Sequence, residues 1–122
     1  MYSHVEGYKS RAVGEHSHAE GKQNYSFGNQ SHTEGIYTIA NGDAQHTQGR
    51  YNIEDTSNKY AHIVGNGTDY KTRSNAHTLD WDGNAWYQGT VECTGIILTS
   101  PNGTKYKVTV SDDGTLTSIA VQ

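Results

Sequence analysis

The sequence has 122 residues, enough for one ordinary domain or two small ones. Its net charge is −4 and its charged residues are scattered, so we expect neither a nucleic-acid-binding surface nor a solvating acidic tail. Apolar residues make up only 32% of the chain, well below the roughly 45–50% of globular proteins. Any stable order in this chain must therefore come from something other than a large apolar core.

Three further features bear on the class of protein. The start, Met1–His4, lacks the basic and apolar regions of a signal peptide, so we expect none. The longest apolar run is Ile96–Leu98, far short of the roughly 20 residues that span a bilayer, so we expect no membrane insertion. Cys93 is the single cysteine, which leaves no intrachain disulfide and no cysteine zinc set. Because the repeat described next already runs at Ser3, we expect the chain to be part of a longer protein.

A short repeat dominates the first part of the chain. The segments SHVEG, SHAEG, SHTEG and QHTQG recur every fourteen residues. Glycine recurs every seven residues, at Gly7, Gly14, Gly21, Gly28, Gly35, Gly42 and Gly49. The position two before each glycine is small or β-branched: Val5, Ala12, Ala19, Ser26, Thr33, Ala40 and Thr47. Such regularity indicates a repeat architecture.

Seven residues is also the period of a coiled coil. That alternative fails because the heptads lack an apolar seam, and a glycine in each would cost a helix about 1 kcal/mol. The remaining interpretation is a series of short strands that meet at glycine corners, where positive φ is tolerated. Two such halves make one coil of fourteen residues, and the coils stack as a β-roll at about 4.8 Å spacing.

The alternation of side chains along a strand sorts the repeat into two faces. The small residues point into the roll, and an outward row holds His4 with Glu6, His18 with Glu20, His32 with Glu34, and His46 with Gln48. An interior of alanine, serine and threonine buries little apolar area. At roughly 25 cal/mol per Å², that area hardly offsets an ordering entropy of about 1–2 kcal/mol per residue. We therefore expect the roll to self-associate.

The SHxEG repeats, with a glycine every seven residues, resemble the left-handed parallel β-roll heads of trimeric autotransporter adhesins. They resemble more closely the version of this repeat in tail and baseplate proteins of phages and prophages of Gram-positive bacteria. The resemblance covers roughly residues 3–75 and implies three left-handed rolls around a threefold axis, with one strand of each coil facing it. Adhesin heads carry valine and isoleucine at the outward positions of that strand, where this chain has histidine and glutamate.

After Gly49 the register of the repeat slips, and residues 50–59 are expected to form a protruding loop. The rest is predicted to form antiparallel hairpins, with turns at Asp82-Gly83, Pro101–Gly103 and Asp113-Gly114. The segments LDWDGNAWYQG and SPNGTKYKVTVSDDGTL resemble the ends of phage tail and baseplate proteins, whose hairpins intertwine around the same axis. The expected architecture is thus all-β and homotrimeric, with a roll over residues 1–75 and a trimerisation region of β-hairpins over residues 76–122.

The His-x-Glu pairs allow two interpretations. Imidazole and carboxylate together suit zinc or nickel, or they form rings of hydrogen-bonded side chains on the trimer axis that fix register and trimeric state. We favour the polar rings, made by His4, Glu6, His18, Glu20, His32, Glu34, His46 and Gln48, and expect no metal and no cofactor. In such rings the carboxylates would raise the pKa of the histidines, and that stability would be lost as the pH climbs.

No residue pattern in the chain is typical of an enzyme. The letters Ser17-His18-Glu20 imitate a triad, but neighbouring strand residues point to opposite faces, so the serine cannot meet its histidine. Four carboxylates lie at or beside turn glycines, where aspartate is favoured for local hydrogen bonds rather than as a glycosidase pair: Asp80, Asp82, Asp112 and Asp113. We predict that the chain is not an enzyme.

Three aromatic residues, Trp81, Trp86 and Tyr87, are candidates for stacking on sugar rings, although packing at subunit contacts is the stronger expectation. The predicted function is a structural or host-binding module of a phage or prophage tail-fibre or baseplate protein, located in the virion as a rigid trimeric stalk or receptor-binding tip. Its expected partners are its own copies and, as a candidate ligand, a host cell-surface glycan or protein. The alternatives are the head of a bacterial surface adhesin and the non-catalytic spacer of a glycan-degrading tail spike.

Overall fold

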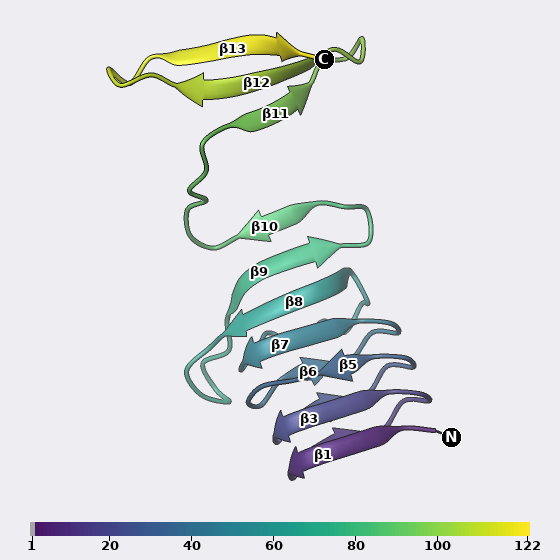
Figure 1. Ribbon diagram of the computed structural model, residues 1–122. Coiled ribbons are helices and arrows are strands. Elements are labelled where there is room, and N and C mark those ends of the chain that lie inside the picture. The colour runs from purple at the N-terminus through teal and green to yellow at the C-terminus, as the bar shows by residue number, and fades with distance from the viewer. Residues whose placement is uncertain (1) are drawn as a thin grey trace. The chain divides into compact units, whose positions relative to one another are not determined.

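The computed structural model describes residues 2–122, and all of its regular secondary structure is β (Figure 1). The prediction of an all-β chain with stacked parallel coils is confirmed. The chain divides into two compact units, residues 1–89 and residues 90–122. No helix in the described part of the chain is long and apolar enough to cross a membrane.

The first unit is a β-solenoid with two sheets (Figure 1). Some coils contribute a strand to both sheets, and the others contribute a strand to the larger sheet only. One sheet has the order β1-β3-β5-β7-β8-β9-β10 and the other β2-β4-β6. The strands are β1 (His4–Tyr8), β2 (Arg11–Ala12), β3 (His18–Lys22), β4 (Tyr25–Ser26), β5 (His32–Thr33), β6 (Ile39–Ala40), β7 (His46–Arg50), β8 (Tyr60–Asn66), β9 (Asn75–Asp80) and β10 (Ala85–Tyr87). Strands of successive coils pair in parallel up to β8, so that His4 pairs with His18 and His18 with His32.

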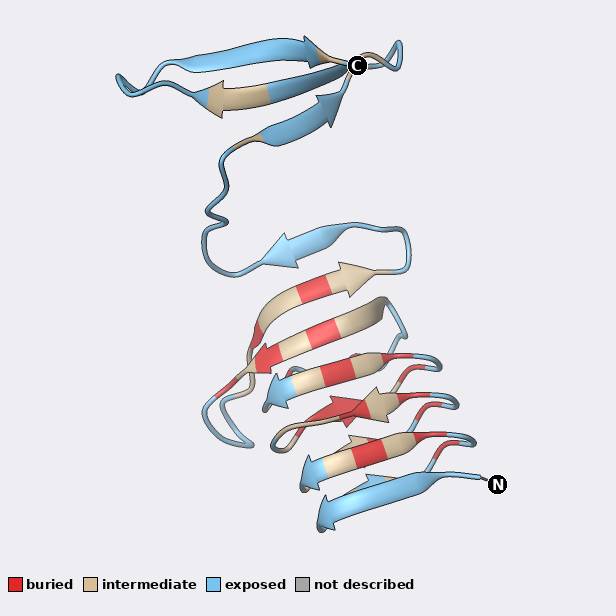
Figure 2. Ribbon diagram, in the orientation of Figure 1, coloured by how far each residue is buried: buried red, intermediate tan, exposed pale blue. Residues whose placement is uncertain are grey.

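The interior of the roll is narrow and mostly polar. Ala19, Ser26 and Thr33 are fully buried, as expected for residues that were predicted to point into the roll. Among the described residues, the buried apolar side chains are confined to Ala19, Ile39, Ala40 and Ile63 (Figure 2). Val5 is 43% exposed because β1 lies at the edge of its sheet, with a neighbouring strand on one side only.

The glycines of the repeat serve two different purposes. Gly7, Gly21, Gly35 and Gly49 have φ between 92° and 106°, the left-handed region that favours glycine. Gly14, Gly28 and Gly42 do not have positive φ. At Gly14 and Gly28 the requirement is crowding alone, since an added Cβ would overlap the backbone carbonyl of the glycine one coil further on; the positive-φ glycines are crowded in the same way. The predicted positive φ is therefore correct for alternate corners only.

Each corner also contains a left-handed residue that is not glycine. These residues recur every seven positions with φ between 43° and 57°: Lys9, His16, Gln23, Gln30, Tyr37, Ala44, Tyr51 and Asn58. The conformation costs an L-residue roughly 1–2 kcal/mol. The corner backbone is thus imposed by the stacking of coils rather than by the local sequence.

Polar side chains inside the corners join one coil to the next. The Asn24 carboxamide is fully buried, accepts a hydrogen bond from the Thr38 amide at 2.9 Å and donates to the Gly35 carbonyl at 2.9 Å. Asn52 accepts from the amide of Ile39 at 2.8 Å in the same way. These ladders satisfy backbone groups that an apolar interior would leave without partners.

The two extra residues after Gly49 are absorbed without disturbing the row of histidines, because His46 pairs directly with His62. The expected protruding loop over residues 50–59 is partly embedded, since Asn52 is fully buried and Asp55 is 6% exposed. Burial raises the pKa of Asp55, but hydrogen bonds from the Tyr60 and Lys59 amides and from the Ser57 and Gln45 side chains together outweigh it and leave the pKa lowered. The loop therefore packs back onto the roll through its polar side chains.

Strands β9 and β10 run antiparallel and extend the sheet of the roll. The first compact unit consequently continues to Gly89, beyond the predicted division after residue 75. The second unit is a three-stranded antiparallel sheet of β11 (Ile96–Thr99), β12 (Lys105–Val110) and β13 (Leu116–Val121). Its hairpins turn at the predicted Pro101–Gly103 and Asp113-Gly114 segments. No residue of this unit is buried (Figure 2).

Candidate functional site

A continuous row of imidazole rings crosses the large sheet of the roll. Each coil from β1 to β8 contributes its histidine, because residues that pair in a parallel sheet point to the same face. The ring centroids of His18 and His32 are 4.6 Å apart with planes 4° from parallel, and those of His32 and His46 are 4.7 Å apart with planes 3° from parallel. His62 and His77 extend the row at 5.2 Å and 5.8 Å with tilted and edge-on rings. The row thus continues beyond the four histidines of the fourteen-residue repeat.

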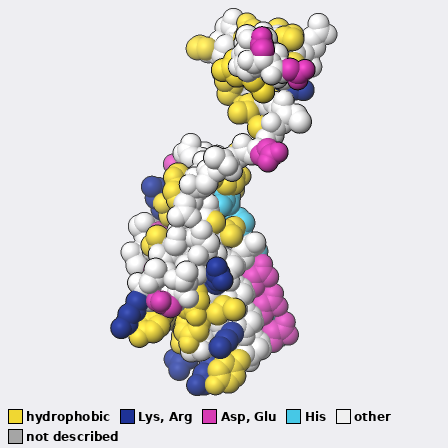
Figure 3. Space-filling model, turned by 90° about the vertical axis from the view of Figure 1, so that its left-hand side faces the viewer, with side chains coloured by type: hydrophobic (Ala, Val, Ile, Leu, Met, Phe, Trp, Pro, Cys, Tyr) yellow, Lys and Arg dark blue, Asp and Glu magenta, His cyan; other side chains and the backbone are white. Residues whose placement is uncertain are grey.

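A second row of carboxylates runs beside the imidazoles. Glu6, Glu20 and Glu34 line a shallow groove, and acidic side chains gather along this edge of the roll in Figure 3. The Nε2 atom of His46 lies 3.3 Å from Glu34 Oε1, and that of His32 lies 3.5 Å from Glu20 Oε1. Neither contact has hydrogen-bond geometry, so the buried Nε2 atoms of His32 and His46 have no hydrogen-bond partner. The imidazoles and carboxylates therefore lie close to each other, but the buried Nε2 atoms have no hydrogen-bond partner within one chain.

The surroundings of His62 lower the pKa of its imidazole from the usual value of 6.5. Burial lowers its pKa, and the charges of His46 and His77 lower it further, while Glu34 raises it less. His62 was not among the histidines expected in axial rings, and the residue two positions after it is Val64 rather than a carboxylate. Burial is the largest cause of the lowered pKa at His62.

The triad-like letters and the turn aspartates have structural partners. The Ser17 hydroxyl is buried and donates to the Gly14 carbonyl at 2.6 Å, whereas the His18 ring lies in the outward stack. Asp80 accepts from the Asn84 amide and side chain, which lowers the pKa of Asp80. Asp113 accepts from the Ser111 hydroxyl and from the Thr115 amide, which lowers the pKa of Asp113 to about 2. Both aspartates thus hold their turns, as predicted.

The structure separates the three aromatic residues predicted to contact sugars. Tyr87 stacks on His77 with ring centroids 4.4 Å apart, at the end of the imidazole row. Trp81 donates its indole N–H to Asn58 at 3.2 Å. Trp86 alone lines a groove. They therefore do not form one aromatic platform.

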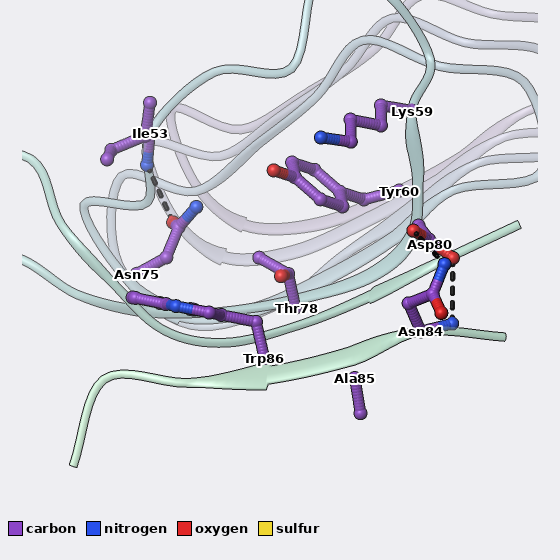
Figure 4. Close-up of a pocket in the computed structure, with 9 residues that line it drawn as sticks. All are labelled: Ile53, Lys59, Tyr60, Asn75, Thr78, Asp80, Asn84, Ala85 and Trp86. Carbon is purple, nitrogen blue, oxygen red and sulfur yellow. Dashed lines mark hydrogen bonds between the residues drawn. The ribbon is translucent and has the colours of Figure 1, made fainter. Parts of the chain in front are cut away.

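The groove at Trp86 lies between the embedded loop and strands β9 and β10 (Figure 4). The Trp86 ring lies along one wall and the Tyr60 ring along the other, with Thr78 between them. The floor includes Asn75, whose side chain accepts a hydrogen bond from the Ile53 amide at 2.9 Å. Its volume of about 330 Å³ is at the lower end of small-molecule sites. The sequence indicated Trp86 as a candidate contact residue, but it does not show which loop lies opposite Trp86.

The second unit carries a large apolar surface. Strand register and alternation place Ile96, Leu98, Tyr106, Val108, Val110, Leu116 and Ala120 on one side of the sheet, called here the apolar face. Leu98 is 56%, Val110 63% and Leu116 72% exposed. The opposite side mixes Ile97 and Ile119 with lysine and threonine. Alternation within β12 was visible in the sequence, whereas the run at Ile96–Leu98 carried no signal of its register.

In comparisons with known proteins, no family model, no curated protein and no solved structure matches this chain. Two surfaces of the chain itself bear on its function. One is the histidine–glutamate row, made by the stacked imidazoles of the large sheet and the neighbouring carboxylates of Glu6, Glu20 and Glu34. It presents buried polar atoms that have no hydrogen-bond partner. The other is the apolar face of the terminal sheet, which presents uncovered apolar side chains. Both are surfaces suited to contact with another molecule.

Proposed function

We propose that this chain is a self-associating structural segment: a homotrimeric, non-enzymatic stalk or receptor-binding tip of a phage or prophage tail-fibre or baseplate protein. The assignment to phage tails depends on the SHxEG resemblance. The self-association has support in the structure, from the apolar face of the terminal sheet. Three copies around an axis is the arrangement that the resemblance implies for such rolls.

The observation that carries the proposal is a sheet without a core. The unit of residues 90–122 has no buried residue, yet seven of its side chains form the apolar face. A small sheet needs a covered apolar face to be stable in water, and contiguous apolar patches on soluble proteins mark interaction sites. The apolar face carries no charged residue, so copies of itself can cover it without desolvating a charge.

The histidine–glutamate row supports the same proposal from the roll. It offers imidazole donors and carboxylate acceptors side by side, and such a surface is complementary to a copy of itself. Its buried Nε2 atoms lack partners within the chain, and orphaned buried polar atoms carry a cost of about 1–3 kcal/mol each. Facing a threefold axis, the row would find those partners in the neighbouring copies.

The test is the mass of the chain in solution, measured by light scattering after gel filtration. The proposal expects three times 13.4 kDa. Val108→Asp places a charge at the centre of the apolar face, opposite Ile96 and Ser118, and is expected to dissociate the assembly. Thr109→Asp is the matched control, because it adds the same charge to the other side of the same strand.

A folded wild-type chain of 13.4 kDa would contradict the proposal. So would an assembly that both variants leave intact, because the apolar face would then not be the contact. Circular dichroism of each variant checks that the roll keeps its β-structure. In that case a change in mass reports association rather than unfolding.

A further inference from the structure

The carboxylates of the histidine–glutamate row are not neutralised by basic side chains. Glu6 and Glu20 are paired residues of adjacent strands, and like charges placed directly opposite in a sheet destabilise it. Within residues 2–122, the ion pairs of Glu20 and Glu34 are with histidines, and none is with lysine or arginine. The negative charge of these carboxylates is therefore not balanced by lysine or arginine within residues 2–122.

One part of the row brings two imidazoles and a carboxylate together. Donor atoms of His32, Glu34 and His46 lie within 4.8 Å of one another. Two nitrogens and one oxygen, with a fourth position free for water, is a donor set of zinc sites, and imidazole also suits nickel and copper. The neighbouring group of Glu6, His18 and Glu20 has a single imidazole and two carboxylates, which makes it the weaker candidate.

The distance between two of these donors already fits a tetrahedral ion. Zinc bonds of about 2.0–2.1 Å place ligand atoms about 3.3–3.4 Å apart. His46 Nε2 and Glu34 Oε1 are 3.3 Å apart without forming a hydrogen bond. The Nε2 atoms of His32 and His46 are buried and unpartnered, so an ion would satisfy both at once.

Binding requires one ring to turn. Parallel rings stacked at 4.7 Å direct their nitrogen lone pairs in parallel, so a single ion cannot lie in the plane of both His32 and His46. Rotation of one imidazole about its Cβ–Cγ bond makes the lone pairs converge and gives up the stacking contact between the two rings. The side chains of His32 and His46 are 34% and 39% exposed, which leaves room for the turn and a path for the ion.

We propose that His32, Glu34 and His46 form a binding site for a divalent transition-metal ion of the zinc class. The ion neutralises the Glu34 carboxylate, satisfies the two imidazole nitrogens and ties β5 to β7 across the row. The ligands come from one chain, so the site forms without the proposed assembly; within an assembly, the ion and the neighbouring copies are alternative partners for the same Nε2 atoms. Hard ions such as magnesium, which prefer all-oxygen ligands, are excluded by the two imidazoles.

The test is calorimetric titration of the chain, without a polyhistidine tag, with zinc chloride near neutral pH. One ion per chain is expected to bind at this site, and magnesium chloride is expected to give no saturable heat. Glu34→Gln and His46→Gln should each weaken zinc binding at least about tenfold, a loss that substitutions even outside the ligand shell cause. Glu34→Gln is a mild change, since Gln48 occupies the corresponding position one coil further on.

His16→Asn is the matched control, because His16 lies at a corner outside the row and asparagine tolerates its φ of 57°. It should bind zinc as the unaltered chain does. Zinc should also raise the unfolding temperature of the unaltered chain and not that of Glu34→Gln. The proposal is overturned by an absence of saturable zinc binding, by equal binding of magnesium, or by variants of Glu34 and His46 that bind like the control.

Discussion

The roll and the terminal sheet are both β-structures, but different forces hold them. In the roll, the buried side chains are mainly polar and amide, hydroxyl and carboxylate groups join one coil to the next. In the terminal sheet no side chain is buried, and the apolar face lies open. The roll therefore joins its coils through polar groups inside one chain, whereas the terminal sheet leaves its apolar groups for another.

This difference determines which substitutions each region tolerates. A polar interior with backbone in close contact tolerates neither an added atom nor a lost hydrogen bond. An open apolar face tolerates such changes but depends on being covered. Substitutions inside the roll should accordingly change the free energy of unfolding, and substitutions on the apolar face should change association.

The largest expected effect comes from an added methyl group at a crowded corner. In Gly28→Ala the new Cβ would overlap the Gly42 carbonyl, and the coils cannot separate because Phe27 and Gly28 donate to the Ala40 carbonyl. We expect the free energy of unfolding to fall by about 3 kcal/mol or more. Chemical denaturation followed by circular dichroism measures it.

Gly89→Ala is the control for that prediction, since a Cβ at Gly89 would meet nothing within 4 Å and its φ is not positive. Its effect should stay within about 0.5 kcal/mol. Equal stability of the two variants would mean that the coils are not in close contact at their corners.

A smaller loss is expected when a ladder of the interior is cut. Asn24→Ala removes a fully buried carboxamide that bonds to the Thr38 amide and to the carbonyls of Glu20 and Gly35. The groups left without partners should cost about 2–3 kcal/mol in unfolding free energy. Asn29→Ala, which removes one exposed hydrogen bond, should cost less than about 1 kcal/mol. If the order of the two variants were reversed, the polar ladders would not stabilise the roll.

The pH dependence of the roll sharpens the comparison further. The folded pKa of His62 is lowered from its usual value of 6.5, so the unfolded chain binds the proton more tightly than the folded one. The contribution of His62 to stability is then complete above pH 6.5 and is lost as the pH falls through the lowered value. Unfolding measured from neutral toward acid pH should show this loss, and His62→Gln should flatten it. A free energy of unfolding that instead rises on acidification, with a rise that His62→Gln removes, would contradict the lowered pKa of His62.

The smallest effect concerns the left-handed corners. Ala44 has φ 57°, which strains a residue with a Cβ, and Ala44→Gly should raise the unfolding free energy by up to about 1 kcal/mol after the entropy of glycine is deducted. Ala40→Gly, at a fully buried position without positive φ, should lower it. Melting temperatures of the two variants separate these directions.

The sequence allowed the roll to be predicted because its glycines, small residues and histidines recur at fixed spacing. It did not reveal the left-handed residues, since positions such as Lys9 and Ala44 have no residue type that marks positive φ; the stacking of coils imposes it. The continuation of the histidine row to His62 was also missed. Its spacing departs from fourteen, and only the folded loop shows that the two extra residues leave the register of the strands unchanged.

The candidate surfaces were predictable to different degrees. The outward direction of His32 and Glu34 follows from alternation along a strand, and so was predicted. Their unpartnered nitrogens were not, because hydrogen-bond geometry depends on rotamers that a sequence does not specify. The apolar face required the register between β11 and β12, in which Ile96 pairs with Val108. A run of three apolar residues does not reveal which of them points to which side.

Amide hydrogen exchange, followed separately over residues 1–89 and 90–122 as the protein is diluted, tests the central claim most directly. The account predicts that amides of β11–β13 are protected while the chains are associated and lose protection on dilution, because nothing inside one chain covers their sheet. Amides of the terminal sheet that stay equally protected in a dilute single chain would contradict it.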